Sequence, residues 1–153
     1  MALHFPHSHP PAAGELTEVV PGVFWLRMPL PFQLDHINLW LLRDGNGWVI
    51  IDTGFPEDHV RETWSLILDR LDGPVNKLVV THFHPDHLGL ATWLMDKTGA
   101  PLWMSTGEFL TAHVVWNEVG GHGARFMVEQ FRQHGLDAEN LGKFEKRGSG
   151  YRK

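Results

Sequence analysis

One run of nine residues, THFHPDHLG from Thr81 to Gly89, constrains this chain more than any other segment. It directly follows a short apolar stretch, Lys77 to Val80, which is predicted to be a buried strand. Side chains that follow the end of a buried strand lie at a loop edge that a metal ion and a substrate can reach. The run therefore predicts a metal site at the end of a strand, with four candidate ligands: His82, His84, Asp86 and His87.

The spacing of these residues indicates how they could share metal ions. In an extended segment, side chains two positions apart point the same way, so His82 and His84 can hold one ion between them. Pro85 turns the chain, after which Asp86 and His87 can face a second ion. A single histidine would more often be a surface or hydrogen-bonded residue, but three histidines and an aspartate in this pattern favour a two-metal centre.

Composition narrows the chemistry. A chain of 153 residues fits one ordinary domain with its own core. The formal net charge of −5 disfavours nucleic acid as a partner, and the absence of cysteine leaves only histidine and carboxylate as metal ligands. Neither a signal peptide nor an apolar run of about 20 residues occurs, so we expect a cytoplasmic protein that does not contact membranes.

The chain holds 11 histidines, and several lie outside the motif. The leader, residues 1–15, is rich in proline and histidine and is expected to be disordered. We interpret His4, His7 and His9 as solvated tail residues rather than metal ligands.

Apolar patterning predicts an α/β fold. Two hairpins are expected, and consecutive apolar residues in the second suggest strands covered on both faces. A helix is expected over Asp58 to Leu71, and helical patterning returns after Thr106, with Asp137 as a helix N-cap. Strands are expected at Leu16–Val20, Val23–Met28, Ile37–Leu42, Trp48–Ile51, Lys77–Val80 and Pro101–Met104, and further helices at Leu88–Lys97, Glu108–Glu118, Ala124–His134 and from Asp137 towards Lys146. This order implies a sheet with helices on at least one face.

The motif THFHPDHLG, together with IIDTG (Ile50 to Gly54) and the hairpin that carries Asn38, resembles the metallo-β-lactamase fold superfamily of hydrolases. That superfamily includes glyoxalase II-type thioesterases, lactonases, β-lactamases and some nucleases. The resemblance covers about Pro21 to Trp103. It is specific for the fold, an αββα sandwich, and says little about the substrate.

By this resemblance, His82 and His84 would bind the first metal ion, and Asp86 and His87 the second. Asp86 would also orient the attacking water as a catalytic residue. Asp52 would be a buried carboxylate that orients the metal-binding loop, although an aspartate at the end of a strand could equally cap backbone N–H groups. The remaining histidines are expected on the surface or in packing: His36, His59, His113, His122 and His134.

Family members carry a further histidine, a bridging aspartate and a last histidine on a second half of the sandwich. This chain is expected to hold only the first half, one mixed sheet with helices over residues 16–105, followed by an insertion-like helical segment, residues 106–147, and a tail, residues 148–153. We expect it to be the N-terminal part of a longer protein or a truncated product. A sheet face without its partner sheet would be open to self-association.

The resulting hypothesis is a metal-dependent hydrolase in which water, activated by two metal ions, attacks a small ester, thioester or lactone. Zinc suits the imidazole and carboxylate ligands best, and iron or manganese would also fit. The alternative is a non-catalytic metal-binding remnant or subunit. A nuclease of the same fold is weakened by the acidic charge.

Overall fold

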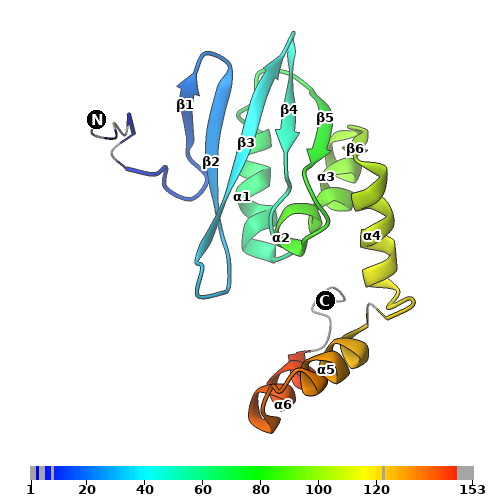
Figure 1. Ribbon diagram of the computed structural model, residues 1–153. Coiled ribbons are helices and arrows are strands. Elements are labelled where there is room, and N and C mark those ends of the chain that lie inside the picture. The colour runs from blue at the N-terminus through cyan, green and yellow to red at the C-terminus, as the bar shows by residue number, and fades with distance from the viewer. Residues whose placement is uncertain (1–2, 4–5, 8, 122, 148–153) are drawn as a thin grey trace. The chain divides into compact units, whose positions relative to one another are not determined.

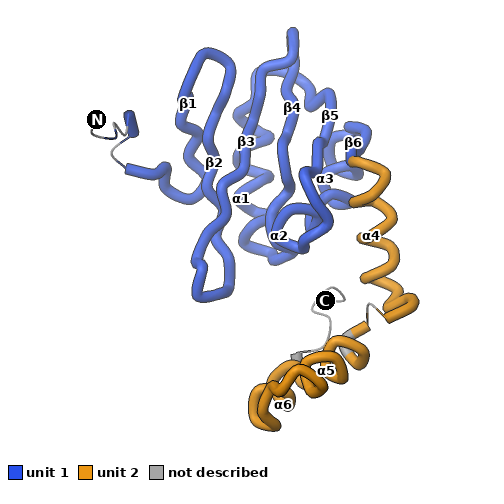
Figure 2. The backbone as a smooth tube through the Cα atoms, viewed as in Figure 1, with its two compact units in different colours: residues 1–104 blue, residues 105–153 orange. Residues whose placement is uncertain are grey.

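The computed structural model describes residues 3, 6, 7, 9–121 and 123–147. His4, His122 and the tail, residues 148–153, lie outside the described residues. The chain divides into two compact units, residues 1–104 and residues 105–153 (Figure 2). The interpretation of residues 106–147 as an insertion remains a prediction. Among the described helices, none has the length and apolar character needed to cross a membrane.

The first unit is built on one mixed sheet of six strands in the order β1-β2-β3-β4-β5-β6 (Figure 1). The first four strands are antiparallel, and β5 and β6 then run parallel to β4. The strands are β1 (Leu16–Val20), β2 (Val23–Pro29), β3 (His36–Asp44), β4 (Gly47–Ile51), β5 (Val75–Val80) and β6 (Leu102–Met104). The α/β class and the mixed sheet expected from the sequence are confirmed.

Three helices fill the connections between the parallel strands: α1 (Asp58–Leu68), α2 (Pro85–Leu88) and α3 (Ala91–Thr98). Helices α1 and α3 pack on one face of the sheet (Figure 1). Trp64 of α1 and Leu94 of α3 are fully buried there against Leu39, Ile50 and Leu78 of the central strands. This core fixes the ends of β4 and β5, where the candidate site lies.

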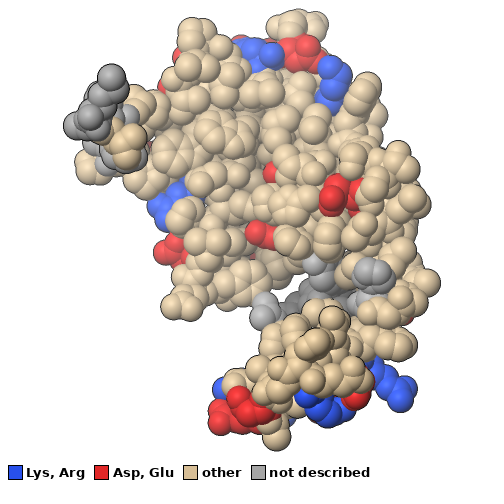
Figure 3. Space-filling view, viewed as in Figure 1, with Lys and Arg blue, Asp and Glu red and all other residues tan. Residues whose placement is uncertain are grey.

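The opposite face of the sheet is less covered than the sequence suggested. Strand β4 is buried on both faces, as expected. In β3, however, burial alternates: Leu39 and Leu41 are buried, Asn38 and Arg43 are exposed, and Trp40 is half-buried. The expectation of coverage on both faces was therefore wrong for β3, because α1 and α3 both pack on the face that carries Leu39 and Leu41. The other side shows mostly uncharged side chains (Figure 3).

Two helix boundaries also differ from expectation. Helix α1 ends at Leu68 rather than Leu71. The residues that follow form backbone hydrogen bonds between positions three apart, as in a 3₁₀ turn, such as that from Leu71 N to Leu68 O at 3.2 Å. The single helix expected over 88–97 is two helices, α2 and α3. The break occurs because Leu90 N donates to the Thr53 hydroxyl, at 3.1 Å, instead of continuing the helical bonding.

The last residues of the leader contact the sheet. Pro11 is buried, Ala13 pairs with Arg27 of β2, and Gly14 N donates to Arg27 O. The His7 ring lies edge-on to Trp25, with ring centroids 6.3 Å apart. The disordered leader expected over residues 1–15 stays a prediction, and these contacts concern only its described residues.

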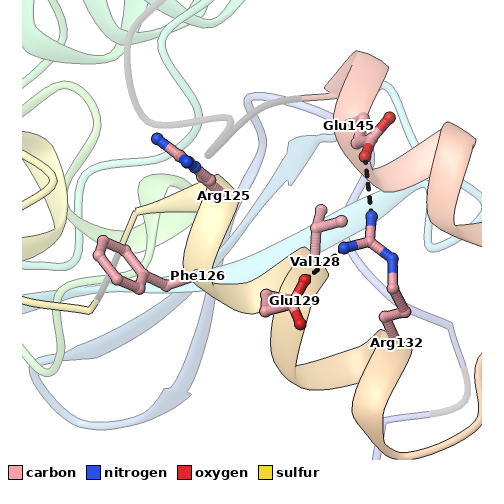
Figure 4. Close-up of a pocket in the computed structure, with 6 residues that line it drawn as sticks. All are labelled: Arg125, Phe126, Val128, Glu129, Arg132 and Glu145. Atoms are coloured by element: carbon pink, nitrogen blue, oxygen red, sulfur yellow. Dashed lines mark hydrogen bonds and ion pairs between the residues drawn. The ribbon is translucent and has the colours of Figure 1, made fainter.

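The second unit is helical: α4 (Thr106–Trp116), α5 (Ala124–Gln133) and α6 (Ala138–Arg147). Asp137 caps α6 as predicted, because its Oδ1 accepts a hydrogen bond from Asn140 N at 2.9 Å. Helices α5 and α6 pack through the Phe131 and Phe144 rings and through the ion pair of Arg132 with Glu145, while Arg132 also pairs with Glu129 within α5. An open pocket of about 750 Å³ lies beside these ion pairs (Figure 4), lined by Arg125, Phe126, Val128, Glu129, Arg132 and Glu145.

Candidate metal centre

The four predicted ligands lie in the loop after β5 and in helix α2. Strand β5 ends at Val80, and Pro85 then starts α2, where the fixed φ of proline suits the first helical position. The short helix places Asp86 and His87 next to the loop that carries His82 and His84, where the chain bends at residues 81–83 rather than running extended as expected. The turn predicted at Pro85 is therefore present.

The structure brings these side chains together. His82 Nε2 lies 3.0 Å from His84 Nδ1, and the His82 and His87 ring centroids are 3.8 Å apart. His87 Nε2 lies 3.6 Å from Asp86 Oδ2. The His87 and Asp86 side chains are 20% and 26% exposed, so the cluster is partly shielded but open to solvent.

The donor set suits a metal ion in chemistry, but the side chains are not arranged as a ready cage. Imidazole nitrogens and a carboxylate are ligands for zinc, iron or manganese. Across residues 9–121 and the other described positions, however, no three His, Asp or Glu groups are poised to hold one ion. His82 and His84 direct nitrogens at each other instead. Metal binding would require at least one of these rings to rotate.

Asp52 holds this loop from the end of β4. Its backbone has φ of 61°, in the left-handed region, which turns the carboxylate back towards the loop. Asp52 Oδ2 lies 2.8 Å from His87 Nδ1, and Oδ1 accepts from Thr81 N at 2.7 Å. The bond with His87 Nδ1 fits the interpretation that Asp52 orients the loop, and the bond from Thr81 N fits backbone capping. The role of Asp52 towards a metal remains a prediction.

The protonation of this pair follows from its surroundings. Burial raises the pKa of Asp52, but the hydrogen bonds from His87 and Thr81 outweigh burial and bring that pKa below its usual value. Asp52 is therefore ionised near neutral pH and can only accept hydrogen bonds. An acceptor at this position favours the His87 tautomer with the proton on Nδ1, in which the lone pair of Nε2 is available to a metal ion.

The pKa of His82 is also lowered. Burial is the largest cause, followed by the charges that His87 and His84 would carry when protonated. A neutral imidazole is the form that binds metal. The cluster therefore presents His82 in its ligand form near neutral pH.

Sequence reasoning missed Thr53, which follows Asp52 and is fully buried. Its N and its Oγ1 both donate to His87 O, each at 2.8 Å, and Oγ1 accepts from Leu90 N. Trp64 Nε1 donates to Thr53 O at 2.7 Å. The signal in the sequence was a polar residue soon after the apolar run WVII, where its hydroxyl had to find partners inside the core.

The other described histidines make their contacts elsewhere. His36 pairs with Asp35 at 2.6 Å, and His59 pairs with Glu57 at 3.3 Å. The His113 ring lies edge-on to Phe109 within α4. These contacts agree with the interpretation of the three histidines as surface or packing residues.

Comparison with known proteins places this fold and site in a family. The sequence pattern of the Metallo-beta-lactamase superfamily matches residues 33–134. The chain is similar to a solved beta-lactamase domain protein from Burkholderia ambifaria, with 47% identity and a TM-score of 0.72, over 84% of this chain and 39% of that one. It is also similar to a metallo-beta-lactamase family protein from Thermus thermophilus, with 28% identity and a TM-score of 0.65, over 84% of this chain and 43% of that one.

A curated relative, the Beta-lactamase-like protein 2 homolog of Caenorhabditis elegans, is 30% identical over 81 residues, which are 49% of this chain and 27% of the relative. The chain belongs to the metallo-beta-lactamase superfamily, a family of metal-dependent hydrolases. It spans well under half the length of the relatives described here.

Proposed function

We propose that this chain carries the metal-binding loop of a metal-dependent hydrolase that cleaves a small ester, thioester or lactone. The observation that carries the proposal is the cluster of His82, His84 and His87 with Asp86 at the end of β5. Family membership supports the class of reaction, and the loop chemistry supports the use of a divalent ion.

Each residue has a distinct part in this proposal. His82 and His84 would hold one zinc ion, and Asp86 and His87 a second, with iron or manganese as other occupants. Zinc there would supply Lewis acidity, which lowers the pKa of water towards neutrality and stabilises negative charge on a carbonyl oxygen. Asp86 would orient the attacking water and accept its proton. Asp52 would keep His87 in the tautomer that has Nε2 free.

The proposed substrate is a small molecule rather than a nucleic acid. The net charge of −5 gives no basic field to attract phosphates, and the face of the molecule in Figure 3 shows no continuous basic patch. A nuclease of the same fold is therefore the weaker proposal.

A second candidate is a metal-binding subunit without turnover. It is favoured by the lack of a three-ligand arrangement among the described residues. In this case the partly covered face of the sheet, around Trp40 and Trp103, would serve for association with another copy or subunit.

Zinc-dependent hydrolysis separates the two candidates. The protein is assayed with added zinc on a chromogenic thioester, an acetate ester and a lactone, beside the variants Asp86→Asn and Asp96→Asn. Asp96 is an exposed acid on α3 and serves as the matched control. The hydrolase proposal predicts turnover that Asp86→Asn abolishes and Asp96→Asn retains. Zinc binding with no turnover on any substrate would favour the metal-binding subunit.

A further inference from the structure

Helix α2, which carries Asp86 and His87, is too short to hold itself in place. It has four residues, and a single helical turn has little stability of its own because nucleation fixes several dihedrals for one hydrogen bond. None of the residues of α2 is buried. The position of His87 must therefore be fixed by bonds from other elements.

Asp52 and Thr53 supply those bonds, Asp52 to the side chain of His87 and Thr53 to its backbone. Asp52 accepts from the ring at Nδ1, as described above. Thr53 holds the backbone, because its N and its Oγ1 both donate to the carbonyl oxygen of His87 at 2.8 Å. The left-handed backbone at Asp52 lets neighbouring residues reach the same partner.

The Thr53 hydroxyl also joins α2 to the element that follows. It accepts from Leu90 N at 3.1 Å, and Leu90 is 1% exposed at the start of α3. Thr53 is fixed in turn from α1, since the indole of fully buried Trp64 donates to Thr53 O. A line of hydrogen bonds thus runs from the core through Thr53 to the backbone of His87.

We propose that Thr53 is a positioning residue that sets the orientation of His87 by holding its backbone while Asp52 holds its ring. The proposal rests on the proposed function in one respect, the use of His87 as a metal ligand. Loss of the hydroxyl would remove one of the two bonds to His87 O and leave Leu90 N without its partner in a buried place. The ring would then no longer be held in one alignment with Asp52.

The test uses the full chain and four variants. Thr53→Val keeps the shape and removes the hydroxyl. Thr53→Ser and Thr53→Ala form a pair that differs only in the hydroxyl, and it decides the question if Thr53→Val does not fold. Thr98→Val is the control, because the Thr98 hydroxyl likewise donates to a backbone oxygen and accepts from a backbone N–H, at the far end of α3.

Two readouts are measured for each protein. The first is the tautomer of the His87 ring without metal, from a two-bond ¹H–¹⁵N correlation spectrum. The second is zinc affinity, from competition with a chromophoric chelator. We expect the wild type, Thr53→Ser and Thr98→Val to show a single His87 tautomer with the proton on Nδ1. We expect Thr53→Val and Thr53→Ala to show mixed tautomers and zinc affinity weaker by about tenfold or more.

Unchanged His87 signals and unchanged zinc affinity in both Thr53→Val and Thr53→Ala would overturn the proposal. A lower melting temperature in these variants would not rescue it, because Thr53 would then have only a structural role. If the wild type binds no zinc, the proposed function fails. The His87 tautomer then decides the role of Thr53 by itself.

Discussion

Asp52 and His87 are 35 positions apart in the chain, and their side chains meet at 2.8 Å between Oδ2 and Nδ1. The contact joins the end of β4 to helix α2 and directs the free nitrogen of the ring towards Asp86. A carboxylate behind a histidine ligand fixes the ring and makes it a stronger donor.

Asp52→Ala should weaken zinc binding about 10- to 100-fold, because the His87 ring loses the acceptor that fixes its orientation. A chelator competition assay measures the change. Asp58→Ala is the control, since the Asp58 side chain is 93% exposed on α1. Equal zinc affinities for both variants and the wild type would contradict the role assigned to Asp52.

Trp64 is predicted to be a stability residue. Trp64→Phe should lower the free energy of unfolding by about 2–4 kcal/mol, because it leaves a small cavity and removes the bond to the buried Thr53 O. Urea denaturation provides the measurement. Trp103→Phe, at a side chain 57% exposed, should change the same quantity by less than about 0.5 kcal/mol. A similar decrease in the free energy of unfolding in both variants would contradict the assignment of Trp64, but not Trp103, to the buried core.

Gly89 is predicted to tolerate no side chain. A Cβ there would lie 2.2 Å from Pro85 O and 3.0 Å from Gly54 O, and backbone atoms on both sides cannot easily move away. Gly89→Ala should therefore lower both the melting temperature and zinc affinity. Gly142→Ala, in α6 with nothing within 4 Å, should instead stabilise its helix by about 0.5–1 kcal/mol. Thermal melts and chelator competition on both variants test this contrast.

Acid should weaken the link between the β3–β4 hairpin and the loop after α1. The Arg43 guanidinium, bonded to Asp72 at 2.6 Å, holds the pKa of that carboxyl below its usual value. Since the folded pKa is depressed, the stabilisation is present above the unfolded value near 3.8 and is lost as pH falls through the folded pKa. Carboxyl NMR titration measures the shift.

Asp72→Asn is the control. Below about pH 4, this variant should lack the pH dependence of the free energy of unfolding that Asp72 contributes in the wild type. An Asp72 pKa at or above its ordinary value would contradict the pairing with Arg43.

The sequence predicted the elements whose signals are local. The hairpins, the helix that begins at Asp58 and the cap at Asp137 all follow from turn residues, apolar period or capping chemistry within a few positions. The clustering of the four candidate metal ligands was also predictable, because all four lie within one strand-to-helix turn. These parts needed no knowledge of distant contacts.

What the sequence did not predict depends on residues far apart in the chain. The break between α2 and α3 comes from Thr53, 37 positions before Leu90. The half-covered face of β3 depends on which elements pack against the sheet, and the apolar run INLWLL does not contain that information. The mutual bond between His82 and His84 reflects side-chain rotation, which spacing alone does not determine.

Zinc content shows directly whether the loop after β5 is the metal site. It is determined by mass spectrometry on the purified chain and its variants, after equilibration with zinc and removal of free metal. We expect the wild type and the leader variant His7→Ala/His9→Ala to bind zinc, and His82→Ala/His84→Ala to lose tight binding. Zinc content unchanged by His82→Ala/His84→Ala would contradict the assignment of the metal centre to this loop.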